Sequence, residues 1–460
     1  MRLSWNWLGR HLDLHGLDPH EVGAQLTLKV AELDGVHTLG AGLSDIRLVR
    51  VLNVQKHTGS DKLSVVTIHD GSEPHTLVCG APNAPSAQGK FAAWAPPGTT
   101  LPDGKRIERA TIRGVESAGM LAREAELGIS DDHGGIVVLA GGTPGARLED
   151  VLPIRDVVFE VDNKAITHRA DLWGHRGFAR EIGCLFGRAL WPLELDVTFG
   201  SDSAISVSVE DPGLCPRYTA FAASGLSVAP SPAWLEWLLR AAGLRPRNNL
   251  VDLTNFVMLD LGNPIHAFDA RQIRGGVVVR RARDGEALRT LDGADRQATS
   301  DMLLIADHER SVAIAGVMGL ENSEIVADTT SLILEAATFQ AENVRKTSSR
   351  LGLRTDASAR FEKALDPHLS ADAARHFAKL LLAVVPGAQI TTPLTDVHAP
   401  FPPRQSIVLR PEYAEQRLGI PTPRGKIRAV LEPLGFGVEE TTGGLLVEVP
   451  TWRAMRDIRI

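Results

Sequence analysis

The chain has few of the features that mark several protein classes. Its three cysteines, Cys79, Cys184 and Cys215, lie far apart without a CxxC pair, so they support neither a zinc site nor a disulfide framework. No apolar run is long enough to span a bilayer. The N-terminus lacks the basic and apolar regions of a signal peptide. We therefore expect a cytoplasmic protein with no membrane partner.

Strong charge of either sign is also lacking. The net charge is −7 over 460 residues, which argues against a generally basic nucleic-acid binder, so any RNA contact must come from local patches. A hydrophobic content of 43% and a charged content of 23% are typical of a globular protein. The length is too great for one core, and roughly three or four domains are expected.

Changes in periodicity along the chain predict a multidomain α+β protein. Residues 1–39 read as a small helical unit, in which Asp18-Pro19 starts a helix. Residues 40–150 hold short strands with a period of two and frequent turns, which is typical of a small β-barrel. Residues 204–398 mix strands and helices, and residues 405–460, after a proline-rich linker, read as two helices and two strands.

The segment Asn248–Ala270, NNLVDLTNFVMLDLGNPIHAFDA, places polar residues inside an apolar run. Buried polar groups are costly unless each finds a partner. The segment is therefore either a buried strand and turn whose Asn and Thr cap neighbouring backbone, or the wall of a pocket, and spacing alone leaves both open. The polar residues are Asp252, Thr254 and Asn255, followed by the turn Gly262-Asn263-Pro264 and then His266 and Asp269.

Four segments in this order resemble the family of bacterial phenylalanyl-tRNA synthetase β subunits. They are TNFVMLDLGNPIHAFD, AIAGVMGLENSEI (Ala313–Ile325), LILEAATF (Leu332–Phe339) and RKTSSRLGLRTDASARFEKALDP (Arg345–Pro367). The resemblance extends over the whole chain. It implies an N-terminal helical unit completed by residues 151–200, an OB-fold tRNA-binding domain, a B3/B4 editing domain and a winged-helix-like B5 domain in the ranges 1–39, 40–150, 204–398 and 405–460.

In this family the α subunit activates phenylalanine with ATP, and the β subunit edits tyrosyl-tRNA. The resemblance implies that the chain supports aminoacylation by an α subunit in an assembly of two α and two β chains. It also implies binding of tRNA(Phe) and hydrolysis of mischarged Tyr-tRNA(Phe). The alternative is a non-enzymatic RNA-binding or interaction protein derived from that subunit.

The resemblance also assigns the editing residues. Glu335 matches the carboxylate that meets the tyrosine hydroxyl, and His266 matches a residue that orients groups around a water. The sequence shows no Ser-His-Asp triad or activated cysteine. Leu320 stands where the family usually has glycine, so its side chain either narrows the pocket or alters its rim. The remaining matches around the aminoacyl group are Thr254, Asn255, Ala315 and Gly316.

Two groups of bases are candidates for RNA contacts. Residues 40–150 hold 11 bases and 13 acids, and their one basic cluster is either a phosphate contact or a solvated strand face. The range Arg345–Lys363 carries six bases and two acids. These bases could meet phosphate, pair with acids of a partner subunit, or face solvent on a helix. The basic cluster consists of Lys105, Arg106, Arg109 and Arg113.

Metal binding is expected to be incomplete. His168, Asp171 and His175 suggest a metal site, but a packing helix is the better interpretation of their segment. In the family, the Asp of an R-x-x-D-I segment and three acids after it bind Mg²⁺, and here Asp457 alone is present. One carboxylate is not an oxygen cage for Mg²⁺. We therefore expect a C-terminally truncated member, with Mg²⁺ and ATP belonging to the complete enzyme.

Overall fold

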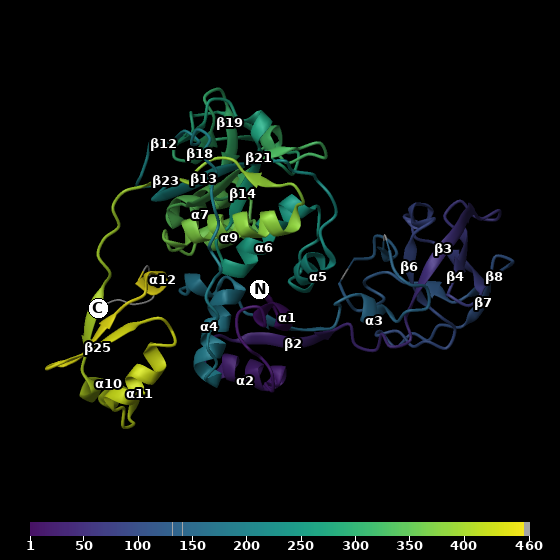
Figure 1. The fold of residues 1–460 in the computed structure, drawn as a ribbon, viewed down its shortest axis with the longest axis horizontal. Helices are drawn as coiled ribbons and strands as arrows, with labels where there is room; N and C mark the ends of the chain where they lie inside the picture. The colour runs from purple at the N-terminus through teal and green to yellow at the C-terminus, as the bar shows by residue number, and fades with distance from the viewer. Residues whose placement is uncertain (131, 140, 455–460) are drawn as a thin grey trace.

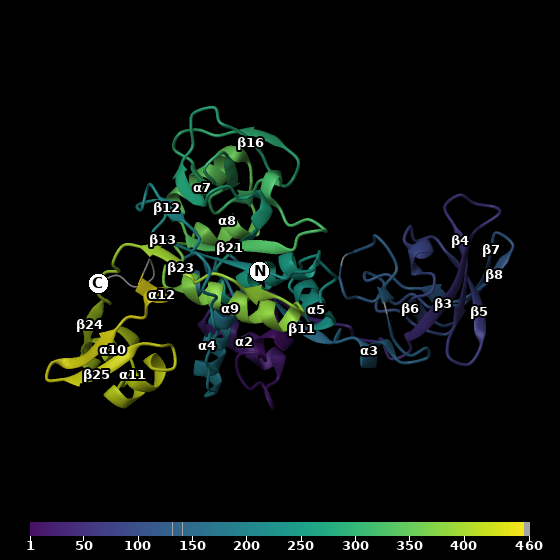
Figure 2. The ribbon, with the colours of Figure 1, turned by 45° about the horizontal axis from the view of Figure 1, so that its top comes forward.

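The computed structural model describes residues 1–130, 132–139 and 141–454. It shows a mixed α+β protein built of several parts, as the sequence predicts (Figures 1 and 2). The part with strands β3–β8 stands to one side of the centre, and the part with α10, α11 and β25 stands to the other. None of the helices in the described ranges is both long and apolar enough to cross a bilayer.

The N-terminal unit contains a sheet as well as helices, so its description as purely helical is wrong. Its helices are α1 (Trp5–Leu8), α2 (Pro19–Lys29) and α4 (His175–Phe186). Its antiparallel sheet has the order β1-β11-β2, formed by Arg2–Ser4, Asp156–Val161 and Leu33–Leu39. The central strand comes from residues 156–161, so residues 1–39 by themselves do not reveal the sheet. Phe159 on that strand is fully buried against both helical and strand residues.

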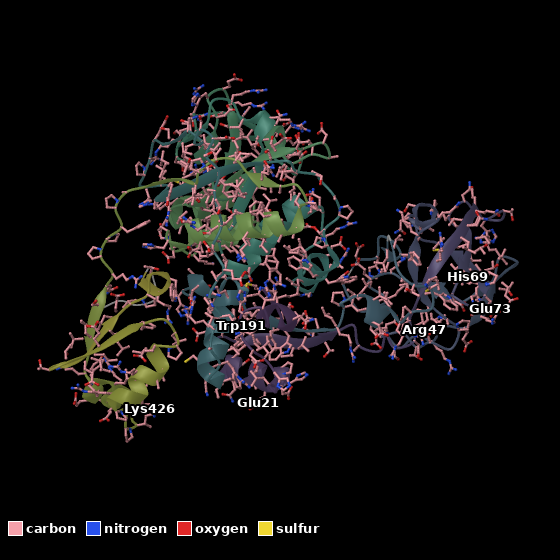
Figure 3. The ribbon with its side chains drawn as sticks, viewed as in Figure 1. Glu21, Arg47, His69, Glu73, Trp191 and Lys426 are labelled. Carbon is pink, nitrogen blue, oxygen red and sulfur yellow. The ribbon has the colours of Figure 1, made fainter. Side chains whose placement is uncertain are left out.

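Residues 47–139 form an antiparallel sheet of six strands. The order is β10-β6-β3-β4-β5, and β9 pairs with β6. The turn between β4 and β5, flanked by His69 and Glu73, lies far from Lys426 of the C-terminal part (Figure 3). The strands are β3 (Arg47–Lys56), β4 (Ser64–His69), β5 (Pro74–Cys79), β6 (Phe91–Ala95), β9 (Met120–Leu121) and β10 (Val138–Leu139), beside the hairpin β7 (Arg109–Ile112) and β8 (Val115–Ala118) and the short helix α3 (Leu148–Val151).

The central part is built from two sheets that share one core. The first has the order β14-β21-β13-β22, with β23 beside β13, and the second has the order β12-β15-β18-β19-β20. The first comprises β13 (Arg217–Ser224), β14 (Ile265–Asp269), β21 (Ser331–Thr338), β22 (Gln389–Ile390) and β23 (Thr395–His398). The second comprises β12 (Val207–Val209), β15 (Val277–Arg281), β18 (Leu303–Ala306), β19 (Ser311–Ile314) and β20 (Met318–Gly319), next to the hairpin β16 (Ala287–Arg289) and β17 (Asp295–Gln297).

The two faces of the first sheet bury different residues because strand side chains alternate. Tyr218 and Ile333 point into the core shared with the second sheet, which α7 (Ala341–Leu351) and α8 (Asp356–Phe361) help to close. Phe221 and Leu334 point to the opposite face. That face is covered by α5 (Ala233–Ala241), α6 (Asn249–Leu261) and α9 (Leu369–Val384) (Figure 1).

The segment Asn248–Ala270 forms a helix and then a strand, so the interpretation as a buried strand and turn is wrong. Asn248 caps helix α6, its side chain accepting hydrogen bonds from the backbone N–H groups of Leu250 and Val251. The helix ends at Gly262, whose φ of 85° is a left-handed conformation that favours glycine. A continuous apolar run suits a buried helix as well as a buried strand, and the length of 13 residues fits the helix.

The C-terminal part contains the expected two helices and two strands, and also one further strand and one further short helix. Its sheet has the order β24-β26-β25. Strand β24 (Ser406–Leu409) lies where the sequence predicts the end of a linker. The predicted Mg²⁺ ligand Asp457 lies outside the described residues. The other elements are α10 (Pro411–Leu418), α11 (Arg424–Leu431), β25 (Gly437–Thr441), β26 (Gly444–Glu448) and α12 (Thr451–Ala454).

Candidate functional site: a carboxyl and an imidazole between two sheets

Two residues singled out from the sequence meet on neighbouring strands. The register of β14 and β21 places His266 directly opposite Glu335. Directly opposed side chains of an antiparallel pair share a face and lie about 5 Å apart at their Cβ atoms. Both residues line a cavity of about 80 Å³ between the two sheets, which Phe361 and Ala357 of α8 also line.

Two glycines, Gly316 and Gly319, also line the cavity. A Cβ added to Gly319 would lie 2.8 Å from Cε1 of His266, so a side chain there would displace the imidazole. Gly316 has a φ of +68°, and its added Cβ would lie 3.0 Å from Cδ2 of Phe339. The wall formed by β19, β20 and the turn between them therefore stays thin, as the expected role of Gly316 requires.

Burial controls the charge of Glu335. The residue is 6% exposed, and its Oε2 is buried and makes no hydrogen bond with the described residues. Burial raises the pKa of Glu335 to about 8, and the nearby Tyr218 hydroxyl opposes that rise. In the empty cavity at neutral pH, the group is therefore mainly a carboxylic acid, able to donate as well as accept a hydrogen bond.

His266 is neutral for the same physical reason. Burial lowers the pKa of His266 to about 4, and its Nε2 is buried without a partner in the described chain. A neutral imidazole donates from one nitrogen and accepts at the other. Buried polar atoms without partners are rare in folded proteins. Two such atoms in one small apolar cavity indicate that it receives a ligand with polar groups.

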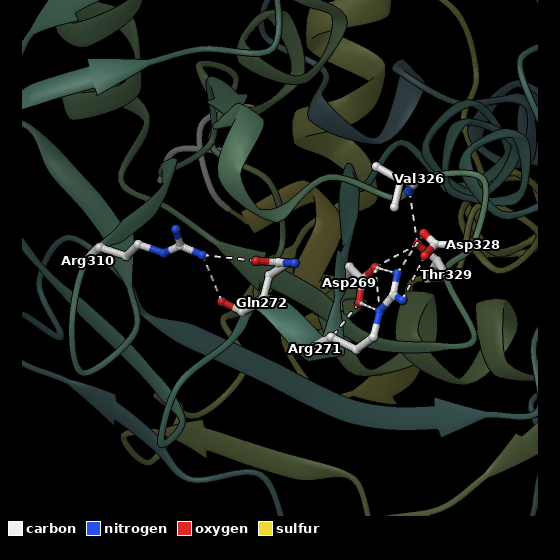
Figure 4. Close-up of polar contacts among 7 residues, drawn as sticks. All are labelled: Asp269, Arg271, Gln272, Arg310, Val326, Asp328 and Thr329. Carbon is white, nitrogen blue, oxygen red and sulfur yellow. Dashed lines mark hydrogen bonds and ion pairs between the residues drawn. The ribbon is translucent and has the colours of Figure 1, made fainter.

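The strand that carries His266 is held at its end by ion pairs and a hydrogen bond among Asp269, Arg271, Asp328 and Thr329, here called the charged clamp (Figure 4). The buried carboxylate of Asp269 accepts from Nη2 of Arg271 at 2.7 Å and from Oγ1 of Thr329 at 2.8 Å. The same Nη2 donates to Oδ1 of Asp328 at 3.0 Å. Burial opposes ionisation, but these donors hold the pKa of Asp269 below its usual value. The clamp thus ties β14 to the loop that precedes β21.

The structure places the other predicted editing residues outside the wall of this cavity. Thr254 and Asn255 lie on α6, and Oγ1 of Thr254 donates to the carbonyl of Val251 at 2.7 Å. Neither they nor Ala315 are among the described residues that line the cavity, whereas Gly316 is. Leu320 is 3% exposed in the core between the sheets and does not line the cavity either.

Three residues near the site are missed by sequence reasoning. Ala357 and Phe361 lie within Arg345–Pro367, a segment that carries the family resemblance and an excess of positive charge, and apolar residues there carry no separate indication of a pocket. Tyr218 comes from β13, more than a hundred residues before Glu335, and strand pairing alone brings the two together. Spacing along the chain could not have identified any of the three.

The predicted RNA-binding bases are exposed, but two of them have partners. Lys105 and Arg106 line a separate cavity of about 410 Å³. Nη1 of Arg109 lies 3.2 Å from Oε1 of Glu116, and Nη1 of Arg113 donates to the carbonyl of Gly59 at 2.7 Å.

The bases of Arg345–Lys363 are not all available to phosphate. Arg360 is 2% exposed and donates from Nε to the carbonyl of Trp173 at 3.1 Å. Lys363 is also buried, and its Nζ lies 2.7 Å from Oε1 of Glu362. Phosphate contact and a solvated helix face are therefore wrong interpretations for these two residues.

The suspected metal ligands have other partners. Nε2 of His175 accepts from the backbone N–H of Ser4 at 3.0 Å, and Nδ1 lies 2.8 Å from the carbonyl of Leu259. Asp171 pairs with Arg169 and Arg180. No group of three or more His, Cys, Asp or Glu residues among those described could hold a metal ion.

Comparison with known proteins agrees with the motifs. Residues 46–147 match a putative tRNA binding domain, residues 214–386 a B3/4 domain, and residues 407–460 a tRNA synthetase B5 domain. A solved N-terminal fragment of the phenylalanyl-tRNA synthetase beta-subunit from Pyrococcus horikoshii aligns with a TM-score of 0.36 and 17% identity, over 66% of this chain and 84% of the fragment.

Curated relatives match almost the whole chain. The phenylalanine–tRNA ligase beta subunit of Solibacter usitatus is 40% identical over 465 residues, which is 100% of this chain and 58% of the relative. That of Geobacter sulfurreducens is 39% identical over 98% of this chain and 57% of the relative. The chain thus spans less than two thirds of the length of these relatives. Over that span, the chain belongs to the phenylalanine–tRNA ligase beta subunit family.

Proposed function

We propose that this chain carries the editing function of a phenylalanine–tRNA ligase and hydrolyses Tyr-tRNA(Phe) that the complete enzyme has mischarged. The observation that carries the proposal is the pair of buried, unpartnered polar atoms on Glu335 and His266 in one small cavity. The cavity lies in the region that matches a B3/4 domain. Its volume of about 80 Å³ suits a side chain and not a nucleotide.

Selectivity for tyrosine follows from the unpaired carboxyl group. Apolar residues such as Ile314 and Phe361 receive the aromatic ring, and Glu335 supplies a partner for the tyrosine hydroxyl. Phenylalanine would leave that buried group unpaired. A site built to hydrogen-bond a hydroxyl rejects the analogue that lacks it by roughly 10⁴–10⁵-fold. The correctly charged Phe-tRNA(Phe) is thereby spared.

The reaction is hydrolysis of the ester between tyrosine and the tRNA 3′ end by a positioned water. The water oxygen bonds to the ester carbon, the bond from that carbon to the ribose oxygen breaks, and the ribose oxygen takes a proton. His266, neutral at pH 7, orients the reacting groups through its two nitrogens. Backbone amides near the thin wall at Gly316 and Gly319 stabilise the developing oxyanion. Thr254, Asn255 and Ala315, which the resemblance matches to the aminoacyl group, do not line this cavity and so do not contact the tyrosine side chain.

The remaining parts of the chain are proposed to serve the complete enzyme. The region around residues 46–147 is an OB-type barrel that binds tRNA(Phe) through its exposed bases Lys105, Arg106, Arg109 and Arg113. The B5 region is winged-helix-like. The chain assembles with an α subunit as two α and two β chains in the cytoplasm. The complete enzyme uses ATP and Mg²⁺ to form Phe-tRNA(Phe), and Asp457 alone makes only an incomplete Mg²⁺ site in this chain.

The decisive experiment is deacylation of charged tRNA by the Glu335→Ala variant. Hydrolysis of Tyr-tRNA(Phe) should fall roughly ten- to a hundredfold, since a buried hydroxyl left without a partner costs about 1–3 kcal/mol. Hydrolysis of Phe-tRNA(Phe), which never used that bond, should change little. His266→Ala should slow hydrolysis with less effect on the choice of amino acid. The assay is run at saturating tRNA, so that a change in tRNA affinity does not enter the comparison.

Glu309→Ala is the matched control, because Glu309 lies exposed in the β18–β19 turn of the same part of the chain. It should hydrolyse Tyr-tRNA(Phe) at the parent rate. Unchanged hydrolysis by Glu335→Ala would refute the assignment and favour the alternative, a non-enzymatic RNA-binding protein derived from the subunit. Such a protein would bind tRNA(Phe) in a gel-shift assay without deacylating it.

A further inference from the structure

Tyr218 stands on the strand beside Glu335, on the same face of the sheet. In the register of β13 and β21, Ala220 lies opposite Glu335 and Tyr218 lies opposite Ala337. Because side chains alternate along a strand, Tyr218 and Ala220 share one face, and this is the face of Glu335. Tyr218 is therefore the diagonal neighbour of Glu335, a separation that an aromatic side chain can bridge.

The hydroxyl of Tyr218 needs a partner. The residue is fully buried, and its Oη makes no hydrogen bond within the described part of the chain. Burial and the neighbouring Glu335 and Cys215 raise the pKa of Tyr218 well above its ordinary value, so the phenol keeps its proton. A buried O–H group without an acceptor is costly. The carboxyl of Glu335, whose Oε2 also lacks a partner, is the acceptor that the diagonal position on β21 offers.

The other groups around Glu335 supply no charged donor to its carboxyl group. His266 faces Glu335 from β14 and is neutral. Cys215 precedes β13, and burial raises the pKa of its thiol, which lies 3.6 Å from the carbonyl of Arg217. The second sheet and α8 present apolar residues such as Ile305 and Phe361 to the cavity. No Lys or Arg is among the described residues that line it.

We propose that Tyr218 is the positioning residue of the editing site, donating a hydrogen bond to Glu335 and aiming its carboxyl group at the tyrosine hydroxyl of the substrate. The proposal rests on the proposed function of Glu335 in reading that hydroxyl. Tyr218 itself does not line the cavity and so acts through Glu335. A donor stabilises the ionised carboxylate and thereby lowers its pKa, against the effect of burial.

Ionisation of Glu335 is measured first in the protein without tRNA. The carboxyl band of Glu335 is identified by infrared difference spectroscopy, as the band lost in Glu335→Gln. In Tyr218→Phe, which removes a single oxygen atom, the pH at which this band titrates should rise by roughly one unit. Tyr413→Phe, the change of the chain's other tyrosine, exposed on α10, should leave the titration where it was. An unchanged titration in Tyr218→Phe would overturn the proposal.

A second measurement does not depend on the stability of the Tyr218→Phe variant. In the Tyr413→Phe background Tyr218 is the only tyrosine, so incorporation of fluorotyrosine alters that residue alone. Fluorination makes the phenol a stronger donor and should move the Glu335 titration to lower pH. Movement in the opposite direction, or none, would contradict the assignment.

Deacylation of Tyr-tRNA(Phe) distinguishes positioning from a general structural role. In Tyr218→Phe, the acidic limb of the profile of deacylation rate against pH should move to higher pH by the same amount as the infrared titration. In a Glu335→Gln background, Tyr218→Phe should have no further effect on the rate. An equal rate loss in both backgrounds would show a purely structural role and overturn the proposal. If Tyr218→Phe shifts the infrared titration while no form of the protein deacylates Tyr-tRNA(Phe), the hydrogen bond stands and the proposed function fails.

Discussion

At the scale of single residues, the burial that suits Glu335 to recognise a hydroxyl also makes the stability of the folded chain depend on pH. Its pKa of about 8 in the folded chain lies above the ordinary value of 4.5 for a glutamic acid. The folded state therefore binds more protons than the unfolded state between these two pH values, and stability falls as pH rises through that window. The full contribution of the protonated group is present below about pH 4.5 and is lost as pH rises through 8.

Glu335→Gln should therefore stabilise the protein progressively above about pH 5. The amide keeps the shape of the carboxyl group but never ionises, so the gain should reach roughly 2–4 kcal/mol near pH 8. Thermal unfolding from pH 5 to 9 measures it. Glu309→Gln, on an exposed turn, should show the pH dependence of the parent protein. If the difference in stability between Glu335→Gln and the parent stayed constant with pH, burial would not raise the pKa of this carboxyl group.

At the scale of elements, helix α6 joins the N-terminal unit to the first sheet of the central part. Asp260 is 1% exposed and accepts hydrogen bonds from Nε1 of Trp7 at 2.7 Å and from Nε2 of His11 at 2.6 Å. Nε2 of His376 on α9 lies 3.0 Å from its other oxygen. Burial opposes ionisation, but the two histidines hold the pKa of Asp260 well below its usual value. The carboxylate therefore contributes stability above the unfolded pKa of about 4, which is lost as pH falls through the folded pKa.

Asp260→Ala should destabilise the protein by about 3–5 kcal/mol at neutral pH, because it leaves three donors without an acceptor, two of them, on Trp7 and His11, buried. A lowered midpoint in thermal unfolding would show the effect. Asp295→Ala is the control, since the side chain of Asp295 is 82% exposed and its pair with Arg289 should contribute less than 1 kcal/mol. Equal losses of stability in the two variants would contradict the role assigned to the buried hydrogen bonds of Asp260.

The elements also show what the sequence can and cannot predict. The short strands within residues 40–150 and helix α2 follow local periodicity and turn residues, and the sequence predicts them. The apolar run of α6 fits two structures, and only its packing against α9 and the first sheet selects the helix. The pairing of His266 with Glu335 depends on strand register across 69 residues, and the contact of Trp7 with Asp260 spans 253. A resemblance to a family can suggest such partners, but periodicity in one chain cannot.

At the scale of the whole molecule, Trp452 is one of the residues that hold the C-terminal part against the rest. The guanidinium of Arg180 on α4 lies 4.2 Å from the centre of the indole ring. Gly435, with a φ of +91°, makes room for the ring, because an added Cβ would lie 2.5 Å from Cζ2 of Trp452. Oγ1 of Thr451 donates to Oδ2 of Asp366 at 2.5 Å. The indole thus joins the C-terminal part to the N-terminal unit, and Thr451 joins it to the central part.

Trp452→Ala should release the C-terminal part while leaving the editing site intact. The variant loses the contact with Arg180 and the packing on Gly435, so the proline-rich segment before β24 should become easier to cleave by protease. The radius of gyration from small-angle scattering should increase. Deacylation of Tyr-tRNA(Phe) at saturating tRNA should stay at the parent rate, because the cavity lies wholly between the two central sheets. Trp191→Ala is the control, since Trp191 is 47% exposed (Figure 3). Unchanged cleavage and scattering in Trp452→Ala would show that other contacts hold the two parts together.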